Sequence, residues 1–443
     1  MSREKKGFVN ILQEFSIPLL LGVGVALVVA NLWPGWYAHA LHWEPFGKLT
    51  VLGHAVSLHF LVNDVFMVFF FGIAAKEITE ACLPGGSLNP LRKALNPLIA
   101  TLGGVVGPGL VFLAGLWICY ASGIYSTETV AWGTAVRGWG VPTATDIALA
   151  WLVSRAVFGK GHPAIDFLLL LAIADDAIGL VIIAVFYGDP SHPSNPAFLG
   201  LVAAAMGLAF ALRRVGLRLW PVYVFGAGPL AWTGLVLAHL HPALALVFVV
   251  PFLPGPRRDV GLFREQDEVD LMGEALAHDL HIEHSPLYRF EHQLKLFVDL
   301  GLFFFAFTNA GVAFSEIGPM TWLILGGLVI GKTIGVTSLG LIATRLGLPL
   351  PSGMGLRELV MAGFIAALGL TVALFVATAA FQDPGLQGQA KMGALFSGFV
   401  GLAALLLGRL VGLGPARTHE PSRSAAVAAL HGPVAPAGSE GES

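Results

Sequence analysis

Long continuous apolar runs are the feature that most constrains how this chain can fold. Twelve of them occur in the 443 residues, near 16–33, 55–75, 97–120, 140–157, 164–187, 197–213, 220–238, 240–253, 295–314, 321–344, 357–381 and 392–413. About 20 consecutive apolar residues span a bilayer as a helix, whereas the strands of a membrane barrel alternate in polarity. Charged residues make up 12% of the chain, against about 25% in soluble globular proteins. The sequence therefore predicts an all-α membrane protein with twelve transmembrane helices.

The distribution of basic residues supports this number of spans. With the N-terminus taken as cytoplasmic, 21 of the 25 Lys and Arg residues lie on the cytoplasmic side. Lys48, Arg137 and Lys391 lie on the opposite side, and Lys332 lies inside a span. Because cytoplasmic loops carry an excess of Lys and Arg, we expect both termini to be cytoplasmic. The net charge of −3 argues against nucleic acid as a partner. The lipid bilayer is the expected partner, and no soluble partner is implied.

Two stretches lie outside the apolar runs. Residues 254–294 form a long, charged, His-rich loop, expected to be cytoplasmic, and residues 414–443 have the composition of a disordered cytoplasmic tail. Residues 1–413 are expected to form one membrane domain with no room for a soluble catalytic domain, so we do not expect an enzyme. In the loop, His278, His281 and His284 have a spacing that could bind a metal, but a solvated loop is the favoured interpretation because no Cys lies nearby.

Charged residues within the apolar runs hold most of the functional information. A charge at mid-membrane costs about 2.5–3.5 kcal/mol on insertion scales, so it needs a partner or a water-filled cavity. Five residues of this kind stand out, namely Asp64, Asp146, Asp175, Asp176 and Lys332. Asp64 lies about a third of the way into its span beside Asn63, as expected for a wet funnel.

The adjacent acids Asp175 and Asp176 lie in the middle of one run. Consecutive residues of a helix point about 100° apart, so the two carboxylates face different surroundings. Lys332 lies too far from either end of its span to reach water easily, and it needs a counter-ion. We therefore expect one Asp to pair with Lys332 and the other to face a cavity. A static salt bridge is the alternative interpretation of the Lys–Asp pair.

Two spans contain residues that weaken a helix at their centres. Pro142 and two threonines precede Asp146, while Gly369 and Thr371 lie in the middle of the run at 357–381. Polar residues at a break in a membrane helix usually line a cavity. Two such segments in distant halves of the chain indicate an inverted-repeat transporter with a site at the membrane midplane.

Several motifs resemble one known family. They include ATDIALAWLV at 144–153, FLLLLAIADDAIGLVIIAVFY at 167–187, Gly331-Lys332 and LPSGMGLRELVMAGFIAALGLTVALFVATAAF at 350–381. These motifs are similar to those of the NhaA family of sodium/proton antiporters, and the resemblance covers about residues 10–413. It implies that spans 3–5 and 10–12 form inverted repeats and that two broken helices, spans four and eleven, cross at mid-membrane.

The resemblance also implies roles for individual residues. Asp176 is expected to be the main Na⁺ ligand, and Asp175 the partner of Lys332. Thr145 and Asp146 are expected to be the polar residues of the first break. Asp64 is expected in a cytoplasmic funnel.

Three further residues, Glu77, His241 and Glu291, are candidates for a pH response. Several members of the family have a Gly at the position of Ala367, and a Phe-Thr-Met-Ser run where this chain has Leu370-Thr371-Val372-Ala373. We therefore expect a less polar second break in this chain.

The implied activity is electrogenic exchange of cytoplasmic Na⁺ or Li⁺ for external H⁺, which serves pH and sodium homeostasis. The resemblance places the protein in the bacterial inner membrane and implies a homodimer. It implies no cofactor beyond the transported ions. A sodium-coupled solute symporter of similar architecture is the alternative. An intramembrane aspartyl protease would need its two Asp on separate helices, which the adjacent pair does not provide.

Overall fold

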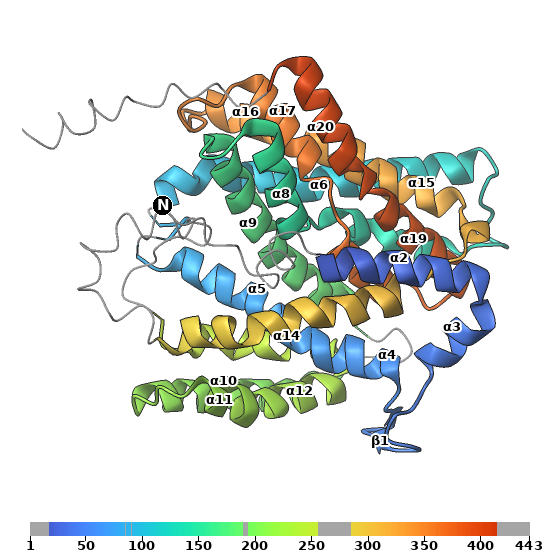
Figure 1. Ribbon diagram of the computed structural model, residues 1–443, viewed down its shortest axis with the longest axis vertical. Helices are drawn as coiled ribbons and strands as arrows, with labels where there is room; N and C mark the ends of the chain where they lie inside the picture. Colours follow the sequence, from blue (N-terminus) through green and yellow to red (C-terminus); the bar gives the residue numbers. More distant parts are fainter. Residues whose placement is uncertain (1–16, 85, 90, 189–193, 256–284, 414–443) are drawn as a thin grey trace, which may run out of the picture.

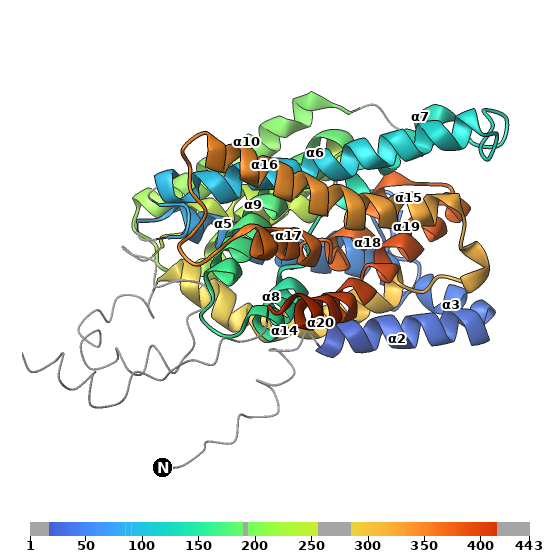
Figure 2. The same ribbon diagram turned by 90° about the horizontal axis from the view of Figure 1, so that it is seen from above.

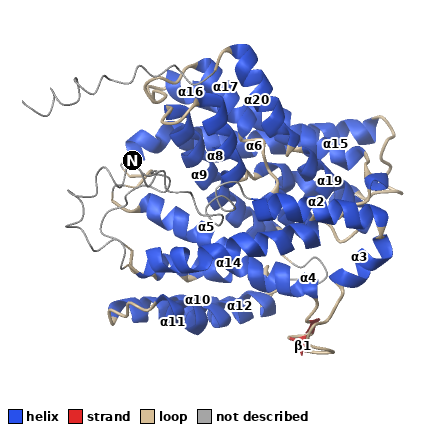
Figure 3. Ribbon diagram, in the orientation of Figure 1, coloured by secondary structure: helices blue, strands red, loops and turns tan. Residues whose placement is uncertain are grey.

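The computed structural model describes residues 17–84, 86–89, 91–188, 194–255 and 285–413. Nearly all of the ordered elements are helices (Figure 3). The α-helices are α2 (Ile17–Leu32), α3 (Pro34–Leu41), α4 (Leu58–Phe60), α5 (Met67–Cys82), α6 (Leu91–Ala121), α7 (Trp132–Ala135), α8 (Ile147–Phe158), α9 (Pro163–Phe186), α10 (Leu199–Arg214), α11 (Trp220–Val222), α12 (Gly228–Leu237), α14 (Pro286–Asn309), α15 (Pro319–Gly326), α16 (Thr333–Arg345), α17 (Leu356–Ile365), α18 (Thr371–Ala380), α19 (Pro384–Phe396) and α20 (Phe399–Val411).

Shorter helical segments and one small hairpin complete the fold. The 3-10 segments are η2 (Val136–Thr143), η3 (Pro196–Phe198), η5 (Pro242–Phe248), η6 (Val250–Phe252) and η7 (Phe314–Glu316), and the π-helical ones are η1 (Leu61–Phe66), η4 (Tyr223–Ala227) and η8 (Gly327–Lys332). Strands β1 (Thr50–Val51) and β2 (His54–Ala55) pair antiparallel. Figure 1 shows this hairpin projecting from one end of the bundle.

The prediction of a multi-pass helical membrane protein is confirmed. Seven helices in the described residues are long and apolar enough to span a membrane, and an eighth span is formed if the bent pair 132–143 and 147–158 is counted as one. Shorter apolar helices cover Ile17–Leu32, Pro242–Phe252 and Thr371–Ala380. Length and composition therefore give fewer spans than the twelve apolar runs, because several runs are interrupted or short.

The predicted loop at 254–294 ends earlier than the sequence suggested. Its last residues belong to α14, which begins at Pro286 after the N-cap Ser285, whose hydroxyl accepts a hydrogen bond from the Tyr288 amide. A serine cap followed by proline is a strong helix start, and it outweighs the polar composition of these turns. His278, His281 and His284, and the predicted tail at 414–443, lie outside the described residues.

The helices lie in layers around α9, whose apolar window is 67% buried, the highest share among the seven long helices. Figure 1 shows α10, α11 and α12 at one edge, with α5 and α14 in the next layer. Helix α14 packs along α2, and α6 packs along α16. Figure 2 shows α6 and α16 running side by side across the top of the molecule. This arrangement places the middle of α9 deep inside the bundle.

The packing of α6 against α16 depends on small residues. A Cβ atom at Gly335 would lie 1.9 Å from the carbonyl oxygen of Gly103, and one at Gly107 would lie 2.3 Å from that of Gly331. Both distances are far shorter than any real contact. Glycine lets the two backbones touch, as is common between membrane helices. Their close approach fixes Lys332, which lies between Gly331 of η8 and Gly335 of α16, against the interior.

A candidate ion-binding site at two crossing helix breaks

The first predicted break is present between η2 and α8, where the segment 132–143, made of α7 and η2, is bent by 47° relative to α8. Pro142 lies near the end of η2, and Ala144 and Asp146 after it have extended backbones. Asp146 is the N-cap of α8, and its carboxylate accepts a hydrogen bond from the Leu149 amide at 3.1 Å. This bond satisfies an amide that has no partner within the helix. The backbone groups of residues 144–146 are thereby available to a neighbouring element.

That neighbour is the second break, between α17 and α18. The Thr145 hydroxyl donates to the carbonyl oxygen of Ala366 at 2.9 Å. The Asp146 amide donates to the carbonyl oxygen of Leu368 at 2.6 Å. The Thr371 hydroxyl donates in turn to the Asp146 carboxylate. The two interrupted segments therefore cross in direct contact, and each supplies hydrogen-bond partners for the other.

Lys332 and Asp175 form an ion pair beside this crossing. The distance from Lys332 Nζ to Asp175 Oδ2 is 2.7 Å, and both side chains have 0% exposure. The same ammonium group donates to the carbonyl oxygen of Thr143, the last residue of η2. The Thr145 hydroxyl lies 2.8 Å from Asp175 Oδ2. The lysine thus compensates the negative charge of the Asp175 carboxylate. It also compensates the partial negative charge at the carboxyl end of η2, where a cation is favourable.

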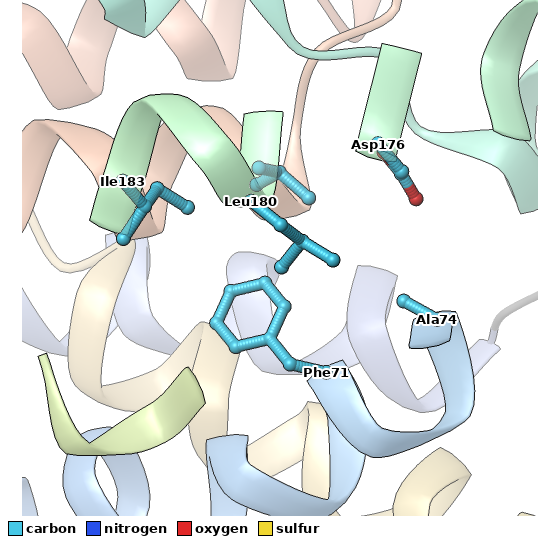
Figure 4. A pocket seen from close by; sticks show the side chains of 6 residues that line it. Phe71, Ala74, Asp176, Leu180 and Ile183 are labelled. Carbon is cyan, nitrogen blue, oxygen red and sulfur yellow. The ribbon is translucent and has the colours of Figure 1, made fainter. Parts of the chain in front are cut away.

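Asp176 points away from this pair, as expected for the next residue of a helix. It lines a pocket with Phe71, Ala74, Leu180, Ile183 and Val372. Figure 4 shows its carboxylate directed into the space between α9 and α5, with Phe71 and Leu180 on the facing walls. Its Oδ1 atom is buried and has no hydrogen-bond partner among the described residues. A buried carboxylate oxygen without a donor is suited to a cation or a proton.

Two further predicted residues, Glu77 and Asp64, differ in how they are placed relative to this pocket. Glu77 follows the pocket residue Ala74 by three positions on α5, and its charge interacts with that of Asp176. Asp64 lies in η1, and its carbonyl oxygen accepts a hydrogen bond from the Trp232 indole at 2.8 Å. The Asp64 side chain is not among those lining the pocket.

The other two candidates for a pH response belong to separate clusters. His241 is the N-cap of η5, and its ring centroid lies 4.6 Å from that of Phe375 on α18. Glu291 on α14 forms an ion pair with Lys76 on α5, which also pairs with Glu80 at 2.6 Å. The structure therefore brings Glu291 to α5, while it places His241 against the second broken span.

Two contacts near the site were not predicted from the sequence. The i, i+4 spacing of Lys76 and Glu80 could have identified their pairing, because such residues are neighbours on a helix. No local signal identifies Ser397, which accepts a hydrogen bond from the Gly369 amide in the second break. A hydroxyl on one span that serves the backbone of another is visible only in the packed structure.

Comparison with known proteins identifies similar chains. The family model described as Na⁺/H⁺ antiporter 1 matches residues 7–410. The Na⁺/H⁺ antiporter NhaA of Desulfitobacterium hafniense (strain DSM 10664 / DCB-2) is 56% identical over 415 residues, covering 93% of this chain and 98% of the relative. The NhaA of Geobacter sulfurreducens is 56% identical over 402 residues, with coverages of 90% and 97%.

A solved structure shares the fold. The sodium proton antiporter MjNhaP1 from Methanocaldococcus jannaschii aligns with a TM-score of 0.52 at 15% identity, over 90% of this chain and 91% of that one. At this level of identity the likeness concerns the arrangement of helices alone.

Proposed function

This chain belongs to the Na⁺/H⁺ antiporter 1 family, and from that premise we propose that Asp176 is the group at which Na⁺ and protons are exchanged. The protein is a secondary transporter that exchanges Na⁺ for H⁺ across a membrane. The observation that carries the assignment to Asp176 is its buried, unpartnered Oδ1 atom in a pocket beside the two breaks. Asp175 Oδ1 is likewise buried without a partner, but the other oxygen of Asp175 is already paired with Lys332. Asp146 accepts hydrogen bonds from Leu149 and Thr371.

The exchange follows from competition for one carboxylate. Asp176 binds either a hard cation or a proton, because each neutralises its charge in a place where a bare charge is costly. Oxygen ligands suit Na⁺ and Li⁺ in the same way, so we propose that both are carried. The site opens alternately to the two sides, and the ion gradient drives the cycle.

Lys332 and Asp175 have a supporting part in this proposal. The Lys332 ammonium group contacts the carbonyl oxygen of Thr143, just before the first break. Its ion-pair partner Asp175 is the sequence neighbour of Asp176. Exchange of one proton on Asp176 for one Na⁺ moves no net charge across the membrane. Release of a second proton from the Lys332–Asp175 pair would make the exchange electrogenic. We propose that Thr145 and Asp146 hold the breaks, that Asp64 lies in the cytoplasmic funnel, and that Glu77, His241 and Glu291 shape the pH response.

We further propose the finer architecture that the resemblance implies. The seven long helices, the bent pair, α2, α14, the pair α17–α18 and the segment η5–η6 together make twelve spans. Spans 3–5 and 10–12 are inverted repeats in this proposal. The membrane domain covers 1–413, the protein resides in the bacterial inner membrane with both termini cytoplasmic, and it forms a homodimer.

The size and lining of the pocket favour ions over an organic solute. The cavity volume of the pocket is about 10 Å³, close to the room that a single water molecule needs, and five of its six lining side chains are apolar. A symporter for an organic solute would need several polar groups to orient its substrate. The pocket offers one carboxylate, which suits a small cation.

The test is exchange by purified protein in acid-inside liposomes, followed by dequenching of a pH dye after addition of Na⁺, Li⁺ or K⁺. We expect Na⁺ and Li⁺ to evoke dequenching with the wild type and not with Asp176→Asn. Asp383→Asn is the matched control, because Asp383 is an exposed N-cap that Asn replaces well. Dequenching that persists in Asp176→Asn, with the control unchanged, would place the exchange at another group.

A further inference from the structure

The backbone of the second break depends on a residue from the last span. Ser397 lies between α19 and α20 and has 0% exposure. Its Oγ atom accepts a hydrogen bond from the Gly369 amide at 3.2 Å. The same hydroxyl donates to the carbonyl oxygen of Ala394 at 2.6 Å. Both hydrogen-bonding capacities of the hydroxyl, donor and acceptor, are thus used at a buried position.

The Gly369 amide has few ways to be satisfied. It lies in the interruption between α17 and α18, where no helical carbonyl is available to it. A Cβ atom at residue 369 would lie 2.8 Å from the carbonyl oxygen of Ala144 in the first break. The two breaks therefore touch at this glycine. A buried amide without a partner costs free energy comparable to a lost hydrogen bond, so the acceptor from Ser397 matters.

This bond acts on the candidate site through one rigid peptide unit. The carbonyl of Leu368 and the amide of Gly369 belong to the same planar group, in which they point in opposite directions. The carbonyl oxygen accepts from the Asp146 amide at 2.6 Å, and the N–H donates to Ser397. The peptide is held at both ends, by the first break on one side and by the last span on the other.

The first break has a comparable support. The Gly140 amide donates to the Tyr187 hydroxyl at 3.0 Å, and Tyr187 follows the end of α9. In both broken spans, a glycine amide near the break is therefore satisfied by a hydroxyl from the span that follows in sequence.

We infer that Ser397 is a positioning residue for cation binding, because it fixes the Leu368–Gly369 peptide against which the Asp146 amide is held. The inference rests on the proposed role of this site in Na⁺ exchange. Ser397 supplies from the last span a polar contact that the apolar side chains of Leu370, Val372 and Ala373 do not offer. Loss of its hydroxyl frees the peptide to rotate and loosens the geometry around Asp175 and Asp176.

The test compares Ser397→Ala with Ser154→Ala in liposome exchange. Ser154 has the same 0% exposure, but its hydroxyl donates only to Trp151 of its own helix. We expect Ser397→Ala to raise the half-saturating Na⁺ concentration about three- to tenfold, from loss of one buried hydrogen bond, with the maximal rate within about twofold. Ser154→Ala should leave both values near those of the wild type.

Hydrogen exchange provides a second readout. Peptides that contain residues 366–371 should exchange faster in Ser397→Ala than in Ser154→Ala. Equal half-saturating Na⁺ concentrations and equal hydrogen exchange in the two variants would overturn the inference. Na⁺-evoked transport by the wild type would in that case leave the proposed function intact. Absence of Na⁺-evoked transport in the wild type would instead contradict the proposed function.

A conservative variant covers the case in which Ser397→Ala does not fold. Ser397→Cys retains a side chain of similar length whose sulfur is a weaker acceptor. We expect its half-saturating Na⁺ concentration to lie above that of the wild type, and a value equal to the wild type would overturn the inference.

Discussion

At the scale of single residues, the buried ion pair is the most exacting feature of this chain. Lys332 and Asp175 are both fully buried, and each compensates a charge that the interior could not otherwise hold. The lysine also binds the carbonyl oxygen of Thr143 at the end of η2. Its charge therefore serves the stability of the break as well as that of the carboxylate.

Removing one member of this pair should cost more than removing both. We expect Lys332→Gln to lower the free energy of unfolding by about 3 kcal/mol, because it leaves a buried carboxylate unpaired. The double variant Lys332→Gln/Asp175→Asn should regain part of this loss. Thermal unfolding midpoints in detergent measure the effect. Strictly additive losses in the double variant would mean that the two groups do not depend on each other.

The sequence predicts a Lys332–Asp pair, but it does not predict the contact of the lysine with the Thr143 carbonyl at the first break. Charges inside apolar runs identify Asp146, Asp175, Asp176 and Lys332 as costly residues, and helix geometry separates the two adjacent acids. Nothing local in the sequence specifies that Ser397 accepts from Gly369, because that contact joins spans whose relative placement arises only from packing.

At the scale of elements, interrupted helices distinguish this fold from a plain bundle. The first break was predictable, because Pro142 and the two threonines oppose a continuous helix, and the second was suggested by Gly369. The π-helical segments η1, η4 and η8 were not predicted. A π-turn inserts one residue into an otherwise regular helix, and its position depends on the neighbours against which the helix packs.

The contact between α6 and α16 gives a prediction at this scale. We expect Gly335→Ala to destabilise the protein by about 1–3 kcal/mol, because the new Cβ would overlap the Gly103 carbonyl and force the helices apart. Gly326→Ala in the same long span is the matched control, since no atom lies within 4 Å of its added Cβ. Thermal midpoints of the two variants should differ clearly. Equal midpoints would show that the two helices separate at little cost.

At the scale of the whole molecule, the positions of the apolar runs predict a multi-pass helical protein, and the fold agrees. The run boundaries were least accurate where polar turns continue a helix, as in residues 286–294 of α14. Hydropathy cannot detect such turns, because their helical state is set by the cap at Ser285 and by packing against α5 and α2. The overall arrangement places the Asp176 pocket between α9 and α5, which come from different parts of the chain.

Competition at a single carboxylate makes a prediction for the pH dependence of transport. When a proton occupies Asp176, Na⁺ must displace it, so the half-saturating Na⁺ concentration should fall as the pH rises. Over the acidic range we expect a change of about tenfold per pH unit for one competing proton. Initial rates of exchange in liposomes at several Na⁺ concentrations and pH values measure it. A half-saturating concentration that is constant over this range would exclude a shared site.

The most direct test of the account is proton release by the purified protein in detergent on addition of Na⁺. Weakly buffered wild-type protein should release protons in proportion to the Na⁺ bound, and Asp383→Asn should behave in the same way. Asp176→Asn should neither bind Na⁺ nor release protons. Wild-type release that persists undiminished in Asp176→Asn would contradict the claim that this carboxylate holds the proton or the cation in turn.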